Sequence, residues 1–221
     1  MINIAIDGPA GAGKSSLSRL LAGKLEYIYV DTGALYRAVG LKFSRLGFDT
    51  NLDGDIDAVL ADTVVDIRFI NGAQRVFLDG EDVSDDIRTP IASMMASAVS
   101  AKPPVRAFLL DMQRKLAENN NVVMDGRDIG TVVLPNAQVK IFLTADVEVR
   151  AERRRKELAE KGQDVPFAEV LEDMKTRDYN DSHRPIAPLK QADDAVLADT
   201  TTLTFEESLE LLLNIVKEGI K

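Results

Sequence analysis

The sequence lacks cysteine altogether, and His183 is the single histidine among its 221 residues. Without cysteine the chain can form no disulfide, carry no thiolate nucleophile and build no cysteine-ligated metal site. His183 stands in a polar stretch, which favours a surface position over a catalytic one. These absences exclude thiol and disulfide chemistry.

Long hydrophobic runs are also missing, since no apolar stretch approaches the length that spans a bilayer. The first apolar run begins at residue 2 and leads directly into a glycine-rich loop, so we expect no signal peptide. The net charge of −9 argues against nucleic acid as a sequence-independent partner. We therefore expect a cytoplasmic protein with no membrane or nucleic-acid partner, a monomer, built as one domain with a small inserted subdomain.

The strongest motif lies at the amino end. Ile2–Ile6 is a short apolar run, typical of a strand buried on both faces. Gly8–Ser15 then matches G-x-x-x-x-G-K-[ST], and from Lys14 the pattern becomes helical. The motif therefore stands in the strand–loop–helix context that a phosphate-binding loop requires.

Each part of this loop suits a triphosphate. Its glycines let backbone N–H groups surround an anion, and the following helix adds the positive end of its dipole. Lys14 can reach the β- and γ-phosphates, and the Ser15 hydroxyl can bind Mg²⁺. The alternative without a function is a glycine-rich turn with a solvated lysine. A dinucleotide-binding fold is disfavoured because, in the G-x-G-x-x-G frame that begins at Gly11, Ser16 stands at the third glycine position. The predicted ATP-binding residues are Gly8, Pro9, Ala10, Gly11, Ala12, Gly13, Lys14, Ser15 and Ser16.

A second strand–tip–helix unit follows. Ile28–Val30 is apolar and ends at Asp31, and the segment Ala34–Leu46 is helical in pattern. Ligands of open α/β sheets bind at the carboxyl ends of such strands. Asp31 is equally compatible with an N-cap, whereas we favour a functional role for Arg37 over a solvated helix position.

Three more strands complete the expected sheet. Asn121–Asp125 ends in a carboxylate that can face the magnesium shell, which is the usual partner of a phosphate loop. Val139–Leu143 and Ala195–Ala198 are the fourth and fifth strands. With a closing helix, Phe205–Glu218, capped by Thr204, the pattern predicts an α/β protein of the P-loop NTPase type. We expect a three-layer fold with a five-stranded parallel core sheet.

An insertion interrupts this alternation. Residues 51–62 resemble a short capped helix, and from Val64 short strands follow, separated by Asn71-Gly72 and Asp79-Gly80. These dipeptides are strong hairpin signals. They predict a small antiparallel β insert, at about 51–104, between core segments 1–50, 105–150 and 185–221.

A basic helix begins near Asp146 and carries Arg150, Arg153, Arg154, Arg155 and Lys156. A second helix, Phe167 to about Asp181, follows an interruption at Gly162–Pro166. A solvated charged face is the bland interpretation. We prefer a helical lid over about 151–184, whose arginines close over phosphates.

Three classes of phosphate-loop protein remain: a kinase, a GTPase switch, and a motor or transporter ATPase. A switch needs a guanine-reading N-K-x-D, which the sequence lacks, and a transporter ATPase needs its own signature and a longer chain. Arginines are plentiful far from the loop, and several are needed to bring two mutually repelling phosphorylated substrates together. The sequence thus favours phosphoryl transfer to a second phosphate.

Several stretches are specific enough to indicate a family. These are D-T-G-A-L-Y-R (31–37), D-G-R-D-I-G-T (125–131), R-A-E-R-R (150–154) and R-D-Y-N-D-S-H-R (177–184), the last followed by A-P-L (187–189). Together they resemble the bacterial-type cytidylate kinases, which are nucleoside monophosphate kinases, from Ile4 to about Phe205. The resemblance implies transfer of a phosphoryl group from ATP to CMP or dCMP with Mg²⁺, in pyrimidine nucleotide metabolism.

The same resemblance implies roles for individual side chains. The CMP phosphate would be held by Arg37 and Arg127; the cytosine by Thr32, Ser97, Arg106 and Asp128; and the sugar by Tyr36, Arg177 and Asp181. The transferring group would meet Lys14, Arg127 and, from the lid side, Arg153, Arg154 and Arg184. Ser15 and Asp125, the latter through water, would bind the metal. Thr32 stands where the family often has serine, which keeps the hydroxyl.

Physical chemistry independently supports the base assignment. Cytosine offers an amino donor beside two acceptors, so an acid and a guanidinium match it, whereas uracil would set an acceptor against the acid. Two alternatives stay open. One is another small phosphate-loop kinase, of the UMP or shikimate type. The other is a regulatory protein that binds a nucleoside triphosphate and hydrolyses it slowly.

Overall fold

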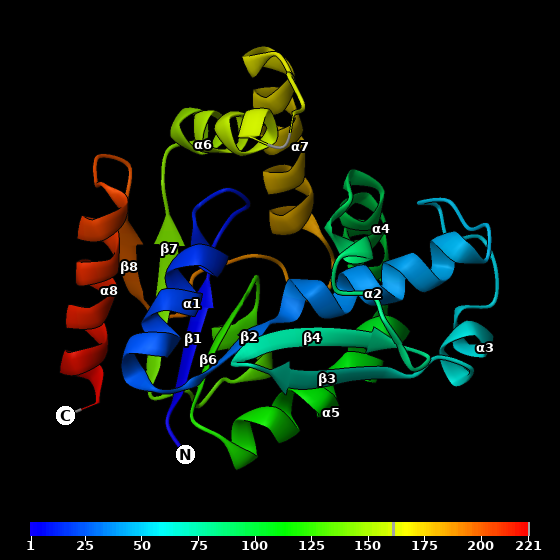
Figure 1. Ribbon diagram of the computed structural model, residues 1–221, viewed down its shortest axis with the longest axis horizontal. Coiled ribbons are helices and arrows are strands. Elements are labelled where there is room, and N and C mark those ends of the chain that lie inside the picture. Colours follow the sequence, from blue (N-terminus) through cyan, green and yellow to red (C-terminus); the bar gives the residue numbers. More distant parts are fainter. Residues whose placement is uncertain (161, 221) are drawn as a thin grey trace. The chain divides into compact units, whose positions relative to one another are not determined.

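The computed structural model describes residues 1–160 and 162–220 (Figure 1). The chain forms two compact units. One consists of Ile28–Asn121, and we call it the hairpin unit. The other joins Ile2–Tyr27 to the residues from Val122 onward, and we call it the loop unit because it contains the glycine-rich loop.

A parallel sheet forms the centre of the loop unit. Its strands, in spatial order, are β6 (Val122–Gly126), β1 (Asn3–Asp7), β7 (Val139–Thr144) and β8 (Val196–Asp199). Ile4, Ala5 and Ile6 are fully buried, as their apolar pattern predicts for a strand covered on both faces. Counting β2 (Ile28–Asp31), the sheet has five strands in the order β2-β6-β1-β7-β8, which confirms the predicted fold class.

Two helices pack on each other and on this sheet: α1 (Lys14–Leu25) and α8 (Phe205–Gly219). Thr204 and Glu207 form the capping box that begins α8, with both reciprocal hydrogen bonds present. A single π-helical turn, η2 (Ile129–Val133), follows β6 and was not predicted.

The predicted lid is a helical hairpin. Its helices α6 (Val147–Glu160) and α7 (Phe167–His183) pack against each other and cross in Figure 1. Between them they bury a small apolar cluster that contains Ala151, Val170 and Met174. Lys161, inside the expected lid range, lies outside the described residues.

The hairpin unit combines helices with an antiparallel sheet. Its helices are α2 (Thr32–Arg45), α3 (Ile56–Ala61), η1 (Asp86–Arg88), α4 (Pro90–Ser100) and α5 (Pro103–Asn119). The sheet contains β3 (Val65–Ile70), β4 (Ala73–Leu78) and β5 (Glu81–Asp82), in that order. Leu35, Val39 and Phe43 of α2 are fully buried in the core that these elements enclose.

The predicted turns are present, but one predicted helix is shorter. Asn71, Gly72, Asp79 and Gly80 all have positive φ, as the hairpin dipeptides require. The helix expected over 51–62 begins only at Ile56. Upstream, Leu52 and Gly54 adopt φ of 55° and 154°, which no right-handed helix accommodates. Within the described residues, no helix is both long and apolar enough to cross a membrane.

Candidate active site

The glycine-rich loop leaves β1 at a point with no room for a side chain. A Cβ on Gly8 would lie 1.9 Å from the Leu143 carbonyl oxygen, and Gly8 has φ of 150°. At the other end of the loop, Gly13 precedes α1 with φ of 86° and no side-chain cap. The first amides of α1 are therefore available to an anion, as in phosphate-binding helix termini.

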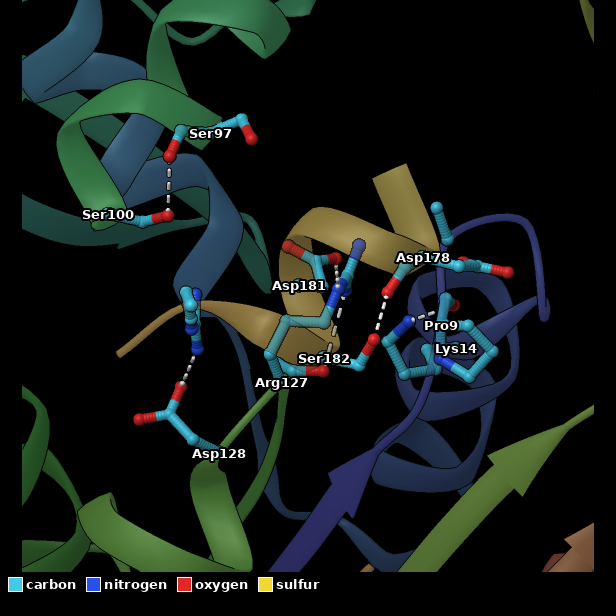
Figure 2. A network of polar contacts seen from close by, with 12 residues as sticks. Pro9, Lys14, Ser97, Ser100, Arg127, Asp128, Asp178, Asp181 and Ser182 are labelled. Carbon is cyan, nitrogen blue, oxygen red and sulfur yellow. Dashed lines mark hydrogen bonds and ion pairs between the residues drawn. The ribbon is translucent and has the colours of Figure 1, made fainter. Parts of the chain in front are cut away.

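Lys14 is buried at the start of α1, with 6% of its surface exposed. Its ammonium donates a hydrogen bond to the Pro9 carbonyl oxygen at 2.7 Å, folding the side chain back over the loop (Figure 2). Burial, followed by repulsion from Arg127, lowers the pKa of Lys14 to about 7, although Asp125 and Asp181 oppose the shift. An anion in the loop would reverse this depression because it would stabilise the ammonium.

Ser15 and Asp125 meet although they are 110 positions apart. The Ser15 hydroxyl donates to the Asp125 carboxylate at 3.0 Å, and Asp125 is buried at the end of β6. Hydroxyl and carboxylate oxygens suit Mg²⁺, which commonly takes one or two protein ligands and completes its shell with phosphate and water. Among the described residues no group of three acidic, histidine or cysteine side chains is placed to hold a metal ion, so the fit is to an ion that phosphate helps to bind rather than to a site built by the protein alone.

Two ion pairs follow directly after Asp125. The Arg127 guanidinium donates to Asp181 at 2.7 Å (Figure 2). Arg184 donates to Asp128 at 3.2 Å. Burial acts to lower the pKa of Arg127, but Asp181, Asp125 and Asp178 together outweigh it and the net shift is upward. The Arg184 and Asp128 side chains are only 7% and 6% exposed. Each predicted substrate-binding arginine here thus already has a carboxylate that orients it.

The other predicted lid arginines point elsewhere. Arg153 donates to the Thr200 hydroxyl at 3.2 Å and the Thr200 carbonyl at 2.7 Å. Arg154 pairs with Glu157 one turn along α6, and Arg177 lies 3.8 Å from Asp173 on α7. These contacts are with Thr200, Glu157 and Asp173, and none is with the glycine-rich loop or Lys14.

The remaining predicted residues lie in the hairpin unit. Asp31 is the N-cap of α2, accepting the Ala34 amide, and its other oxygen accepts a 2.8 Å bond from Arg37. The N-cap interpretation therefore holds for Asp31, and the same carboxylate also orients Arg37. Arg106 lies 5.7 Å from the Tyr36 ring centre and donates to the Ser100 carbonyl at 3.4 Å. Thr32 is buried on α2, and Ser97 is exposed on α4.

Two further charged residues were not among those predicted. Asp7 is buried at the end of β1 and accepts the backbone amides of Ile129 and Gly130, each at 2.7 Å. Burial raises the pKa of Asp7 to about 6, against the lowering effect of these two bonds. The sequence feature that could have identified Asp7 is its position as an acidic residue directly after the apolar run of a buried strand.

Arg150 is the second charged residue that was not predicted to belong to the site. From the sequence it was placed in a basic helix but assigned no role. Its guanidinium binds the Ala10 carbonyl at 3.0 Å, the Ala145 carbonyl at 2.7 Å, and Asp178 through two bonds of 3.2 and 2.6 Å. It is 5% exposed. The buried Arg150 of α6 thus joins the glycine-rich loop to α7, which no local pattern reveals.

The parallel sheet, the glycine-rich loop with its lysine, and the serine–aspartate pair are together the features of a phosphate-loop kinase. Residues 4–218 match the sequence profile of the family described as "Cytidylate kinase". The chain belongs to the cytidylate kinase family.

Curated relatives agree over full lengths. A protein named cytidylate kinase from Caldicellulosiruptor bescii is 52% identical over 220 residues, covering 100% of this chain and 97% of the relative. One of the same name from Caldicellulosiruptor saccharolyticus is 53% identical over 214 residues, covering 97% and 95%. Among solved structures, an uncharacterized protein from Eubacterium ventriosum aligns with a TM-score of 0.54, covering 98% of each chain at 13% identity. That last likeness concerns the fold alone.

Proposed function

We propose that this protein transfers the γ-phosphoryl group of ATP to CMP or dCMP, giving CDP or dCDP, in a Mg²⁺-dependent reaction. The single observation that carries the proposal is membership of the cytidylate kinase family over residues 4–218. The phosphate-binding geometry of the loop and the charge-paired arginines are consistent with it.

The donor triphosphate is assigned to the loop, residues 8–16. Amides at the start of α1 and the Lys14 ammonium would neutralise its β- and γ-phosphates. Ser15 and, through water, Asp125 would hold Mg²⁺, and the bound ion would supply positive charge that offsets the charge of the phosphates. The Lys14 ammonium would be stabilised most strongly, because a bound phosphate would place a negative charge beside this buried positive charge.

The acceptor is assigned to arginines that carboxylates already orient. Arg37, held by Asp31, and Arg127, held by Asp181, would bind the monophosphate. Tyr36, Arg177 and Asp181 would contact the sugar. Guanidinium groups suit this task because they donate two parallel bonds to phosphate oxygens and keep their charge at any physiological pH.

Selection of the base is assigned to four side chains: one carboxylate, one guanidinium and two hydroxyl groups. Asp128 would accept from the cytosine amino group while Arg106 donates to its acceptors, and Thr32 and Ser97 would complete the contacts. Uracil would place a carbonyl against Asp128. A buried group left unpaired costs about 1–3 kcal/mol, so CMP should be preferred over UMP by at least ten- to hundredfold.

The transfer itself needs no general base, because the attacking oxygen belongs to a phosphate that is already ionised. Arg153, Arg154 and Arg184 are assigned to the transferring group from the lid side, beside Lys14 and Arg127. Arg153 and Arg154 would have to leave Thr200 and Glu157 to take this role. Catalysis would then consist of alignment and charge neutralisation.

We extend the proposal to the larger organisation. Residues of about 51–104 would form the monophosphate-binding insert and about 151–184 the lid, in a monomeric enzyme of the cytoplasm, where ATP is available. Size-exclusion chromatography with light scattering tests the monomer, for which the sequence mass is 24.2 kDa.

A substrate panel tests the activity. The protein is incubated with ATP and Mg²⁺ and with CMP, dCMP, UMP, AMP or shikimate in turn, and the nucleotide products are separated by ion-exchange chromatography. CDP and dCDP should accumulate in step with ADP. Transfer to UMP or shikimate but not CMP would favour another phosphate-loop kinase. ADP formation indifferent to every acceptor would favour slow hydrolysis by a regulatory protein.

A further inference from the structure

Asp7 lies one residue before the glycine-rich loop, at the carboxyl end of the central strand β1. Its neighbours in the sheet are Gly126 of β6 and Phe142 of β7, and it is 4% exposed. The loop motif itself does not include this position. An acid held in so dry a place is costly unless hydrogen bonds compensate its charge.

Two consecutive amides provide that compensation. One carboxylate oxygen accepts the Ile129 N–H at 2.7 Å and the other accepts the Gly130 N–H at 2.7 Å. Hydrogen bonds to an ionised acceptor are stronger than neutral ones, and a two-point contact also fixes orientation. Asp7 therefore holds the first turn of η2 against the end of β1.

The residues just before these amides are Arg127 and Asp128. Their segment is held on one side by the pairing of Gly126 with Asp7 and on the other by the bonds of Ile129 and Gly130 to the same residue. Only two residues lie between these anchors, so their backbone has little freedom.

Both side chains of this short segment contact α7 or the residue after it. Arg127 reaches Asp181 (Figure 2). Asp128 reaches Arg184. Packing beneath the turn is also tight. A Cβ on Gly130 would lie 3.3 Å from an Asp7 carboxylate oxygen and 3.2 Å from Cδ of Lys140.

We propose that Asp7 is a positioning residue for acceptor recognition: its two-amide contact sets the direction in which Arg127 and Asp128 present their side chains. Asp7 itself touches neither substrate. The proposal rests on the proposed function, because it assigns the two oriented residues to CMP. It adds a determinant of specificity on the central strand.

The test is steady-state kinetics of Asp7→Asn, with KM measured separately for CMP and ATP. Asparagine keeps the size but sets an NH₂ group against one of the two amides. We expect KM for CMP to rise at least tenfold, KM for ATP to change less than twofold, and the CMP-to-UMP preference to fall. Asp55→Asn, which alters an exposed helix cap that also accepts a backbone amide, is the matched control and should leave all constants unchanged.

A second variant covers the case in which Asp7→Asn does not fold. Gly130→Ala crowds the same carboxylate from the other side and should raise KM for CMP about two- to fivefold, again without moving KM for ATP. Amide exchange at Ile129 and Gly130, followed by NMR, should be faster in either variant.

The outcomes separate cleanly. A wild-type protein that phosphorylates no CMP overturns the proposed function, on which the assignment of the two residues depends. A wild type that phosphorylates CMP, with either folded variant keeping its KM for CMP within twofold, overturns the role of Asp7. Parallel losses for ATP and CMP would also overturn it, because a general structural role predicts them.

Discussion

Arg150 of α6 and Asp178 of α7 form a two-bond ion pair, with N···O distances of 3.2 and 2.6 Å. The same guanidinium binds the carbonyl of Ala10 in the glycine-rich loop and that of Ala145 before α6. One buried side chain of α6 thus connects the proposed donor site to α7. A movement that separates the predicted lid from the loop would break the bond between Arg150 and Ala10.

Removing the charge at Asp178 should weaken this connection. For Asp178→Asn we expect the free energy of unfolding to fall by about 1.5–3 kcal/mol, the usual worth of hydrogen bonds to charged groups. Urea titration measures it. The control is Asp173→Asn on the same helix, whose side chain is 73% exposed and lies 3.8 Å from Arg177, and which should change stability little. Equal losses in the two variants would contradict the prediction.

Lys14→Ala should abolish most turnover while the fold survives. Loss of one group that stabilises transition-state charge typically lowers kcat by about 100- to 1,000-fold. Stability should be unchanged or higher, because burial and Arg127 already disfavour the ammonium and lower its pKa to about 7. Kinetics with CMP and thermal unfolding measure the two effects. Lys24→Ala, at the exposed end of the same helix, is the control, and near-normal activity in Lys14→Ala would refute the role of the loop lysine.

Asp7 should leave a signature in the pH dependence of stability. Its pKa is raised from 3.8 to about 6 in the folded state, so the folded protein holds a proton that the unfolded chain releases at lower pH. The contribution of Asp7 to stability therefore declines as pH rises from about 4 to about 6. Asp7→Asn lacks this decline, so its unfolding free energy relative to wild type should rise by about 2–3 kcal/mol across that window. Urea titrations at half-unit intervals of pH test it, and parallel curves would rule it out.

Asp128→Asn should relax the choice of base. The kcat/KM ratio of CMP to UMP is expected to fall about ten- to hundredfold, because the acceptor that matches the cytosine amino group is weakened. This ratio is insensitive to the fraction of folded enzyme. That matters here because the buried pair of Arg184 and residue 128 loses its charge attraction, so stability should fall too. A variant that keeps its base preference would point to another kinase specificity.

Asp125→Asn should increase the demand for Mg²⁺. Groups that hold a metal through water typically affect its affinity by about 10- to 100-fold, so the Mg²⁺ concentration for half-maximal activity should rise by a comparable factor. Activity is measured across a Mg²⁺ titration at saturating ATP and CMP, and excess chelator should stop the wild-type reaction. An unchanged titration midpoint would remove Asp125 from the metal shell.

The elements that could be predicted are those specified by residues close together in the sequence. The strand–loop–helix at residues 2–25 follows from one apolar run and one motif, and the capping box of α8 from Thr204 and Glu207. The helix expected over 51–62 was too long because its pattern did not show the positive φ of Leu52. The π-turn of η2 was missed because its geometry depends on Asp7, more than 120 positions away.

The sequence by itself determined the sheet-forming alternation, the phosphate-binding loop and the family, because each is written in contiguous residues. Tertiary structure alone decided which polar groups meet: Ser15 with Asp125, Arg127 with Asp181, and Arg150 with both the Ala10 carbonyl and Asp178. The reason is physical. A buried charge takes whichever partner the folded backbone brings within about 3 Å, and spacing along the chain does not encode that distance.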